Sequence, residues 1–441
     1  MTDETAARVR AAALAARHAG KSLAVLPDPT RSALLRSLAH ALEQPATIGE
    51  LLAANHADLE AAHADELAPA LLARLGLSAS KLAGLAEGLR QLADMPGLVG
   101  RVQLRRELDE GLILERVACP LGVLGVVFEA RPDAVVQIAG LALASGNAVL
   151  LKGGAEAMHS NRALVAAIHR VLAEHHVDPA CVALLDDRPA FRALLELDEL
   201  VDLIVARGSG EFVRGVMATT RIPVLGHAEG LCHLYLHADA DPEQAAAIAL
   251  DGKCSYPAAC NATETLLWHR DAEPAATACL RALAERGVEL RGDDDSLALA
   301  GSLGLTMLAA IPGDWDTEYG ELNLSVRRVD DLAAALDHIE RHGSRHTEAI
   351  VCRDLAIGER FVQGIDAACV FVNASTRFAD GQRFGLGAEV GISTSKLHAR
   401  GPVGVEGLLS YRWVLRGSGQ VSEAYGPGKR AFVHRDLPLD E

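Results

Sequence analysis

The sequence predicts an α/β protein built from more than one lobe, and three observations favour this fold class. The chain has 441 residues, which exceeds the size that a single hydrophobic core usually serves, so we expect two or three globular lobes. Hydrophobic residues make up 50% of the chain and aromatic residues only 4%, as is typical of a helix-rich globular protein. Strand and helix patterns alternate from residue 121 onward, which indicates a doubly wound parallel sheet.

The residues before this alternation predict helices and then a hairpin. Up to residue 100, apolar residues recur at three- and four-residue intervals, as at Leu34, Leu38 and Leu42, and prolines interrupt the pattern. This spacing predicts a helical lead-in. Residues 102–118 alternate around an Asp-Glu-Gly turn at 109–111, which predicts a β-hairpin with charge on one face.

The alternating region predicts a nucleotide-binding lobe. Short apolar runs that predict strands are separated by helical patterns, as in βαβ units. The turn Ser145-Gly146-Asn147 ends the first of these helices. The predicted strands are 122–128, 148–152, 182–185, 202–206 and 222–226, and the predicted helices are 133–144, 161–175, 189–196 and 211–219.

A second α/β series starts near Cys232 and predicts another lobe. Its predicted strands are 233–237, 263–269, 348–352 and 368–373, and its predicted helices are 242–250 and 331–342. Residues 408–421 have the pattern of a strand pair that joins the early hairpin. The polar residues that follow predict a loosely held tail.

Charge and cysteine usage narrow the class of protein. Lys and Arg number 42 against 59 Asp and Glu, a formal charge of −17, which gives no broad footprint for nucleic acid. An anionic substrate therefore needs a local cationic cavity. Eight cysteines without a C-x-x-C pair, and a beginning unlike a signal peptide, predict free thiols in a reducing cytoplasm. No apolar run approaches the roughly 18 residues of a membrane span.

Two glycine-bearing turns are candidate phosphate sites. Gly208, Ser209 and Gly210 lie between a predicted strand and a predicted helix, where free backbone N–H groups and the helix dipole favour an anion. The spacing is not G-x-G-x-x-G, so a plain strand-to-helix turn is an equal alternative. The loop 384–391 is a second candidate, and a backbone crossing over a cleft explains it equally well. Lys152 ends a predicted strand, where an ammonium meets a cofactor or simply faces solvent.

Cys260 is the candidate nucleophile. Pro257 and small residues deliver this thiol to the start of a predicted strand. A thiol there acts as a nucleophile if its pKa is lowered, but a structural cysteine is the commoner explanation of an isolated one. Cys254 competes for the role from a predicted helix end.

Other reactive patterns are weak. His342 and His346 have the i, i+4 spacing of a helical metal pair, but Gly343 predicts that the helix ends between them, so no metal site is predicted. G-x-S-x-G is absent, which leaves no basis for a serine hydrolase. Arg131 and Arg377 each lie beside a turn residue and are candidate anion clamps, with surface ion pairs as the alternative.

Six stretches in order resemble one family over nearly the whole chain. They are PLGVLGVVFEARPDA (120–134), LASGNAVLLKGG (143–154), IPVLGHAEGLCHLY (222–235), SYPAACNATETLL (255–267), GSRHTEAIV (343–351) and VNASTRFADGQRFGLGAEVGISTSKLHARGP (372–402). Together they resemble the glutamate-5-semialdehyde dehydrogenase (gamma-glutamyl phosphate reductase) family within the aldehyde dehydrogenase superfamily. Cys260 falls where that family's catalytic thiol lies.

The resemblance implies an aldehyde dehydrogenase-like fold with a Rossmann-type cofactor domain, an α/β catalytic domain and a small β oligomerisation element. The implied reaction is the NADPH-dependent reduction of L-glutamate 5-phosphate through a cysteine thioacyl intermediate. The semialdehyde product then cyclises to 1-pyrroline-5-carboxylate, on the route to proline. The implied site residues are catalytic Cys260 and Asn261, substrate-binding Arg131, Ser344, Glu348 and Arg377, and cofactor-binding Lys152, Gly208, Ser209, Gly210 and Glu318, with no metal.

Two departures from the superfamily bear on chemistry. By the resemblance, Val224 takes the place of the glutamate that prepares water for attack in hydrolysing relatives, so a thioacyl intermediate is shielded from hydrolysis. Ala155 takes the place of an acidic residue that holds the ribose hydroxyls of NAD, which favours NADPH with Lys152 at its 2′-phosphate. Glu156, one residue away, opposes that inference.

The expected domains follow the same resemblance. We expect an NADPH-binding domain at 1–101 and 120–231, a catalytic domain at 232–395, an oligomerisation element at 102–119 and 396–425, and a tail at 426–441. A homo-oligomer is expected, and a glutamate kinase is a possible partner for transfer of the labile substrate. The rival functions are a hydrolysing, NAD-dependent semialdehyde dehydrogenase and a nucleotide-binding scaffold without catalysis.

Overall fold

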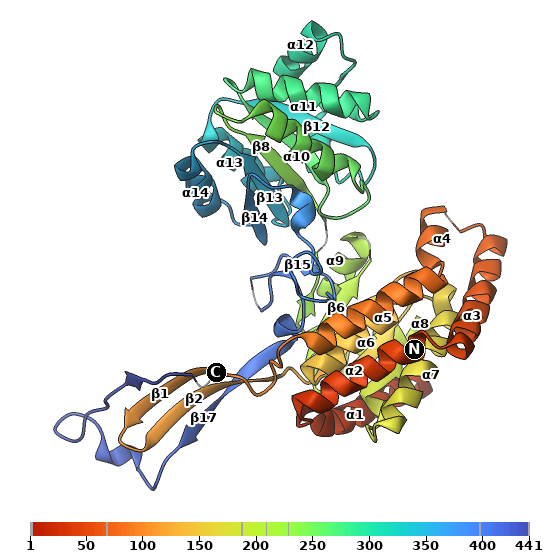
Figure 1. The fold of residues 1–441 in the computed structure, drawn as a ribbon, viewed down its shortest axis with the longest axis vertical. Coiled ribbons are helices and arrows are strands. Elements are labelled where there is room, and N and C mark those ends of the chain that lie inside the picture. The colour runs from red at the N-terminus through yellow and green to blue at the C-terminus, as the bar shows by residue number, and fades with distance from the viewer. Residues whose placement is uncertain are drawn as a thin grey trace.

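The computed structural model describes residues 3–67, 69–186, 188–208, 210–227, 229–396 and 398–439. Figure 1 shows a first lobe that contains the N-terminus, a second lobe beyond it and a β-arm that projects from the first lobe. The separate lobes and the early hairpin predicted from the sequence are therefore confirmed. Ser209 lies outside the described residues.

The first lobe is a five-stranded parallel sheet covered by helices. Its strand order is β5-β4-β3-β6-β7, and all neighbours are parallel. From β3 the chain adds β4 and β5 on one side of the sheet and then β6 and β7 on the other, so the strand order reverses at β3. Ligands of doubly wound sheets bind beyond the carboxyl ends of the strands at such a point. The strands are β3 (Val123–Phe128), β4 (Ala148–Lys152), β5 (Val182–Leu184), β6 (Leu203–Arg207) and β7 (Val224–Leu225).

Apolar periodicity explains the helices of this lobe. Every residue of β3 is buried, because helices pack on both faces of the parallel sheet. Gly146 ends α6 in the left-handed conformation, with φ of 71°, which confirms the predicted turn. The helices are α1 (Asp3–Ala24), α2 (Asp28–Leu42), α3 (Pro45–Ala64), α4 (Pro69–Leu75), α5 (Ala79–Asp94), α6 (Asp133–Ser145), α7 (Met158–Glu174), α8 (Arg188–Leu195) and α9 (Gly210–Thr219).

The second lobe is a seven-stranded parallel sheet in the order β11-β10-β12-β9-β8-β13-β14. The sequence predicted four of these strands, and β10, β11 and β12 were missed. The strands are β8 (Cys232–Leu236), β9 (Thr263–His269), β10 (Glu289–Gly292), β11 (Leu308–Ala309), β12 (Asn323–Val329), β13 (Thr347–Val351) and β14 (Cys369–Val372). The helices are α10 (Pro242–Cys254), α11 (Glu273–Glu285), α12 (Asp294–Ser302), α13 (Leu332–His342) and α14 (Leu355–Gly364).

The arm is a four-stranded antiparallel sheet in the order β17-β2-β1-β18. The predicted hairpin is β1 (Val102–Asp109) and β2 (Leu112–Pro120), and β17 (Leu409–Arg416) pairs with β2 along its whole length. The predicted strand pair at 408–421 is wrong, because this region supplies one strand only. The C-terminal segment is not a separate tail, since β18 (Arg435–Asp436) pairs with β1 and Arg106 forms an ion pair with Asp436 at 2.6 Å.

The chain crosses between the lobes twice. It leaves the first lobe after β7 and returns after β14 through a short pair, β15 (Ile392–Ser393) and β16 (Gly401–Pro402). Val390 and Leu408 belong to the core of the first lobe. The expected end of the catalytic domain at residue 395 therefore lies within chain that packs on the first lobe.

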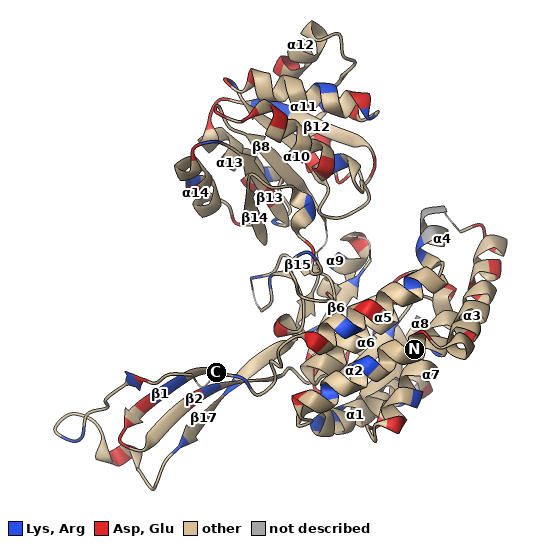
Figure 2. Ribbon diagram, in the orientation of Figure 1, with Lys and Arg blue, Asp and Glu red and all other residues tan. Residues whose placement is uncertain are grey.

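Charged groups are spread over the whole molecule. Figure 2 shows basic and acidic segments interspersed on both lobes and on the arm. None of the described helices combines the length and the apolar character that a bilayer crossing needs. All eight cysteines are free thiols.

Candidate active site

A cavity of about 590 Å³ lies where the carboxyl ends of β3 and β6 face the segments before β8 and β9. The switch-point rule for doubly wound sheets places a ligand at this position. Residues of both lobes line it, including Glu129, Arg131, Arg207, Gly208, Gly210, His227, Cys260, Asn261, Glu318, Arg377 and Glu389.

Cys260 lies in a turn between α10 and β9, as the sequence predicted. The backbone N–H of Ala259 donates to the Tyr256 carbonyl at 3.2 Å, and that of Ala262 donates to the Ala259 carbonyl at 2.9 Å. Within the described residues the backbone N–H groups of Cys260 and Asn261 donate no hydrogen bond, so both groups are available to an oxyanion formed at the thiol. Cys254 ends α10 outside this cavity, and burial raises the pKa of its thiol. The geometry therefore favours Cys260 as nucleophile.

Gly230 fixes the backbone of Cys260 by close approach. A Cβ at this position would lie 2.0 Å from the Cys260 carbonyl oxygen, so only glycine fits. The N–H of Gly230 donates to a carboxylate oxygen of Glu318 at 2.8 Å. Glu318, predicted as a cofactor residue, thus lines the cavity and also holds the loop against the thiol turn. Apart from its place in the motif at 222–235, no local pattern marks Gly230 as a contact of the thiol turn.

The side chain of Asn261 has a structural partner. Its Nδ2 donates to the carbonyl of Ala379 at 2.9 Å, which ties the thiol turn to the segment that returns to the first lobe. The carboxamide of Asn261 therefore has a structural partner, and the catalytic role expected of this residue can rest on its backbone N–H.

Four arginines line the cavity, Arg74, Arg131, Arg207 and Arg377, and the last three bear on the anion clamp. Arg131 and Arg377 were predicted as anion clamps, whereas no role was predicted for Arg207. Arg207 is half-buried, and burial lowers its pKa, with a further contribution from the neighbouring Arg131. Its Nη1 has no hydrogen-bond partner among the described residues. Burial and Arg383 lower the pKa of Arg377, whose Nε donates to Ser255 at 3.2 Å. A half-buried cation with an unused donor is suited to a phosphoryl group.

Titratable groups around the thiol include residues that sequence reasoning missed. A ligand atom of His227, the Cys260 sulfur and a ring nitrogen of His346 all lie within 4.8 Å of one another. An imidazole at this range can take the proton of the thiol. Val224 does not line the cavity, but Glu389 does. Burial raises the pKa of Glu389, and its Oε2 accepts from the N–H of Gly381 at 2.8 Å.

Two predicted substrate residues do not lie in the cavity. The hydroxyl of Ser344 accepts from the N–H of Leu231 at 2.9 Å and donates to the Leu231 carbonyl at 3.2 Å. Glu348 is fully buried in β13, where one carboxylate oxygen accepts from the backbone N–H and from the ring of His233, both at 2.9 Å. These groups hold β8 and the loop before it, so the geometry of the cavity gives no support to either predicted role.

The predicted cofactor residues are only partly brought together. Gly208 and Gly210 line the cavity at the start of α9. Lys152 does not line it: the side chain is buried, and its ammonium donates to the Gly153 carbonyl. The carboxylate of Glu156 accepts from the N–H of Ala130 at 2.5 Å, so it is directed toward the loop after β3.

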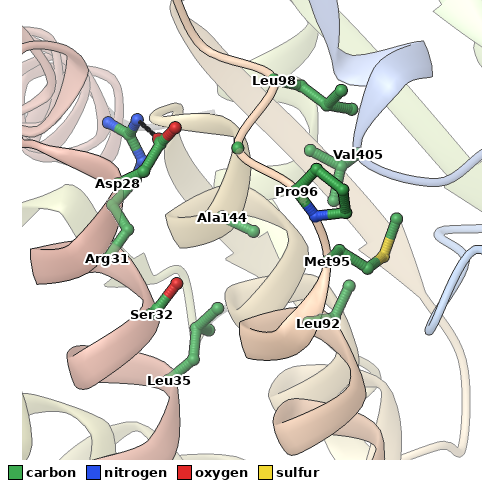
Figure 3. Close-up of a pocket in the computed structure, with 11 residues that line it drawn as sticks. Asp28, Arg31, Ser32, Leu35, Leu92, Met95, Pro96, Leu98, Ala144 and Val405 are labelled. Atoms are coloured by element: carbon green, nitrogen blue, oxygen red, sulfur yellow. Dashed lines mark hydrogen bonds and ion pairs between the residues drawn. The ribbon is translucent and has the colours of Figure 1, made fainter. Parts of the chain in front are cut away.

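A second, smaller hollow carries no chemistry of this kind. It holds about 30 Å³ between α2 and the end of α5, roughly the room of a single water. Figure 3 shows its lining, in which Arg31 pairs with Asp28 and most other side chains are apolar. No cysteine or histidine lines it, so the cavity at Cys260 is the candidate active site.

Comparison with known proteins identifies the family. Residues 1–298 match the model of the aldehyde dehydrogenase family. The chain belongs to the aldehyde dehydrogenase family. It is 54% identical to a gamma-glutamyl phosphate reductase of Cyanothece sp. over 423 residues, covering 96% of each chain. It is 52% identical to one of Prochlorococcus marinus over 437 residues, covering 99% of this chain and 98% of the relative.

Solved aldehyde dehydrogenase structures agree with this assignment. The gamma-glutamyl phosphate reductase of Thermotoga maritima is 32% identical, covers 94% of this chain and 99% of its own, and superposes with a TM-score of 0.89. An acetylating aldehyde dehydrogenase of Geobacillus thermoglucosidasius, 15% identical over 95% of this chain, superposes with a TM-score of 0.68, which reflects the shared fold alone. Within the aldehyde dehydrogenases, the chain is a member of the gamma-glutamyl phosphate reductases, and the predicted fold class is confirmed.

Proposed function

We propose that this chain reduces L-glutamate 5-phosphate to L-glutamate 5-semialdehyde and phosphate, with NADPH as reductant. The observation that carries the proposal is Cys260 in a cavity that also holds Arg131, Arg207 and Arg377. A nucleophilic sulfur beside guanidinium groups is suited to an acyl carbon that bears a phosphate. Relatives more than half identical along nearly the whole chain bear the name of this activity.

The protein groups take up defined tasks in this reaction. The Cys260 thiolate forms a bond to the acyl carbon as the carbon–oxygen bond to phosphate breaks, and the phosphate leaves toward the arginines. The backbone N–H groups of Cys260 and Asn261 stabilise the oxyanion, each contributing about 3 kcal/mol. When bound, NADPH supplies the hydride that reduces the thioester. The resulting thiohemiacetal collapses to the aldehyde and frees the thiol, and the aldehyde cyclises to 1-pyrroline-5-carboxylate on the way to proline.

The first lobe has features that fit a dinucleotide. A Cβ at Gly208 would lie 2.7 Å from Phe212 and 2.9 Å from a carboxylate oxygen of Glu129, so the glycine leaves the backbone open just before α9. The helix N-terminus there favours a phosphate. Ala155 offers no carboxylate against a 2′-phosphate, and Glu156 is engaged with Ala130, which supports NADPH over NADH. Lys152 can pair with the 2′-phosphate only if its ammonium gives up the hydrogen bond to the Gly153 carbonyl.

The rival reaction is hydrolysis to an acid with NAD. Val224 in place of a carboxylate opposes it, whereas Glu389 in the cavity is a carboxylate that hydrolysis would need. An assay of semialdehyde oxidation separates the two reactions: the proposed enzyme requires inorganic phosphate and makes the acyl phosphate, whereas the rival makes glutamate without phosphate. Acid production independent of phosphate contradicts the proposal.

Replacement of the nucleophile tests the covalent route. We expect Cys260→Ala to abolish reduction, with NADPH binding and the unfolding midpoint close to wild type, since the side chain is small and half-buried. The matched control is Cys254→Ala, six residues upstream and outside the cavity, which keeps its activity. An acyl adduct found on any cysteine other than Cys260 excludes the mechanism, and an inert scaffold forms no adduct at all.

The arm supports a homo-oligomer, and the proposal places the protein in the cytoplasm. Strand β17 lies at the edge of the arm sheet and exposes Tyr411, Trp413 and Leu415. An exposed apolar edge strand pairs readily with a second chain. We include in the proposal that the arm joins subunits, and that a glutamate kinase delivers the labile acyl phosphate.

A further inference from the structure

We propose that His227, Cys260 and His346 form a reversible Zn²⁺ site, so that zinc binding masks the nucleophile. One ligand atom from each of the three residues lies within 4.8 Å of the other two. Imidazole nitrogen and thiolate sulfur are the donors that Zn²⁺ prefers, and three protein ligands with a fourth position open to water or substrate are its usual set in enzyme sites. The inference concerns a metal site and does not depend on the acyl-phosphate activity.

The hydrogen bonds of the two histidines leave one nitrogen of each for a metal. Nδ1 of His227 lies 3.0 Å from the carbonyl oxygen of Ile392. A carbonyl only accepts, so Nδ1 carries the proton and Nε2 carries a lone pair. This is the arrangement by which a carbonyl orients a metal-bound imidazole.

His346 provides the second, independent observation. The residue is fully buried, and its Nδ1 lies 2.9 Å from the hydroxyl of Thr347. Its Nε2 is buried and has no hydrogen-bond partner among the described residues. A buried polar atom without a partner is costly in a protein interior. A bound ion at Nε2 removes that cost.

The relative position of the two rings agrees with shared coordination. Their centroids are 5.0 Å apart and their planes meet at 76°. Two imidazoles on one tetrahedral ion, each with its nitrogen about 2.0 Å from the metal, place their centroids at about this separation. The three residues come from the segments after β7, before β9 and before β13, so the site spans the junction of the lobes.

Charge near the site makes the binding reversible. Arg207 and Arg377 interact electrostatically with Cys260. Their positive charges oppose the charge of the ion. On binding, Zn²⁺ replaces the thiol proton, which passes to solvent, and no electron is transferred. A chelator then restores the free thiol.

The test measures binding of Zn²⁺ and Co²⁺ to the purified full-length chain. We expect one Zn²⁺ per chain in competition with a chromogenic chelator, slower alkylation of Cys260 by iodoacetamide, and a thiolate-to-Co²⁺ charge-transfer band with tetrahedral d–d bands. We expect Zn²⁺ binding to weaken by at least about 100-fold in each of the variants Cys260→Ser, His227→Gln and His346→Gln. Loss of a residue that only hydrogen-bonds to a metal ligand already costs up to about 100-fold, and these variants lose the ligand itself. Cys254→Ser, the matched thiol control, binds as wild type.

Several results overturn the proposal. A Co²⁺ complex without a thiolate band, or Zn²⁺ affinity unchanged in His227→Gln, places the metal elsewhere. If His346→Gln fails to fold, the spectrum of the wild-type Co²⁺ complex and the half-exposed His227 still decide the question. The site is also refuted if the chain binds no Zn²⁺ although its Cys260 is a free thiol that iodoacetamide can alkylate.

Discussion

Replacement of Gly230 by alanine tests whether the position of the thiol is set by backbone contact. The added Cβ would lie 2.0 Å from the carbonyl oxygen, 2.6 Å from the carbonyl carbon and 2.7 Å from the Cα of Cys260. Ordinary contact begins at 3.4 Å, so the two segments must separate by about 1.4 Å. All three atoms are backbone, so no side-chain rotation relieves the clash.

A displacement of this size has a large effect on rate. Misplacement of a reacting group by about 1 Å costs about 100-fold, which corresponds to about 2.7 kcal/mol of barrier. We therefore expect Gly230→Ala to lower the single-turnover rate of phosphate-dependent NADP⁺ reduction by at least that factor. The N–H that bonds Glu318 remains in the variant, so the cofactor should still bind.

The control and the refuting result are both well defined. Gly49→Ala adds the same methyl group where nothing lies within 4 Å, in helix α3. It should leave the rate unchanged and stabilise the fold by about 0.5–1 kcal/mol. If Gly230→Ala keeps most of the wild-type rate, then contact at this glycine does not position the nucleophile.

Three further predictions concern the cavity, the core and the arm. Arg207→Gln should lower kcat/KM for the acyl phosphate by about 100-fold or more with little change in cofactor affinity; an effect on cofactor affinity alone would contradict the clamp role. Burial raises the pKa of Glu264, which pairs with buried Lys253 at 2.6 Å, from 4.5 to about 7. The folded state then holds a proton that the unfolded chain has released, so this group's share of the unfolding free energy falls as pH rises from about 4.5 to about 7, by at most about 3 kcal/mol. Urea unfolding at pH 5 and pH 7.5 should show this loss in wild type and not in Lys253→Met/Glu264→Leu; parallel behaviour of the two proteins would refute it. Trp413→Glu on β17 should disrupt pairing of the arms and so reduce the molar mass measured by light scattering. An unchanged mass would show that subunits do not associate through this edge.

Local sequence patterns predicted much of the fold, but they could not predict contacts between strands that are far apart in the chain. The turn at Gly146 and the thiol turn after Pro257 follow from residue types that allow few conformations. Strands β10 and β11 were missed because both are short, and both residues of β11 are exposed, so that no buried face marks the strand. A two-residue strand such as β18 has no alternation that a pattern can detect.

The site residues divide in the same way. Cys260 and Arg131 were predicted because a motif carries each of them. Glu348 lies outside the cavity because its strand lies beside β8, where His233 bonds to the carboxylate. His346 lies near Cys260, and Arg207 is half-buried, because of parallel strands that are far apart in the chain. A local sequence pattern cannot predict which distant strands become neighbours.

The two crossings between the lobes affect the order of folding during synthesis. The first lobe needs residues near the end of the chain, since the carboxamide of Asn147 donates to the carbonyl of Leu408, 261 positions later. The second lobe is built from one continuous stretch, from β8 to β14. During synthesis, the second lobe can therefore finish folding before the first lobe. Until residues near Leu408 are made, part of the apolar surface of the first sheet stays uncovered. Such an exposed intermediate is prone to aggregation and is a natural client for chaperones.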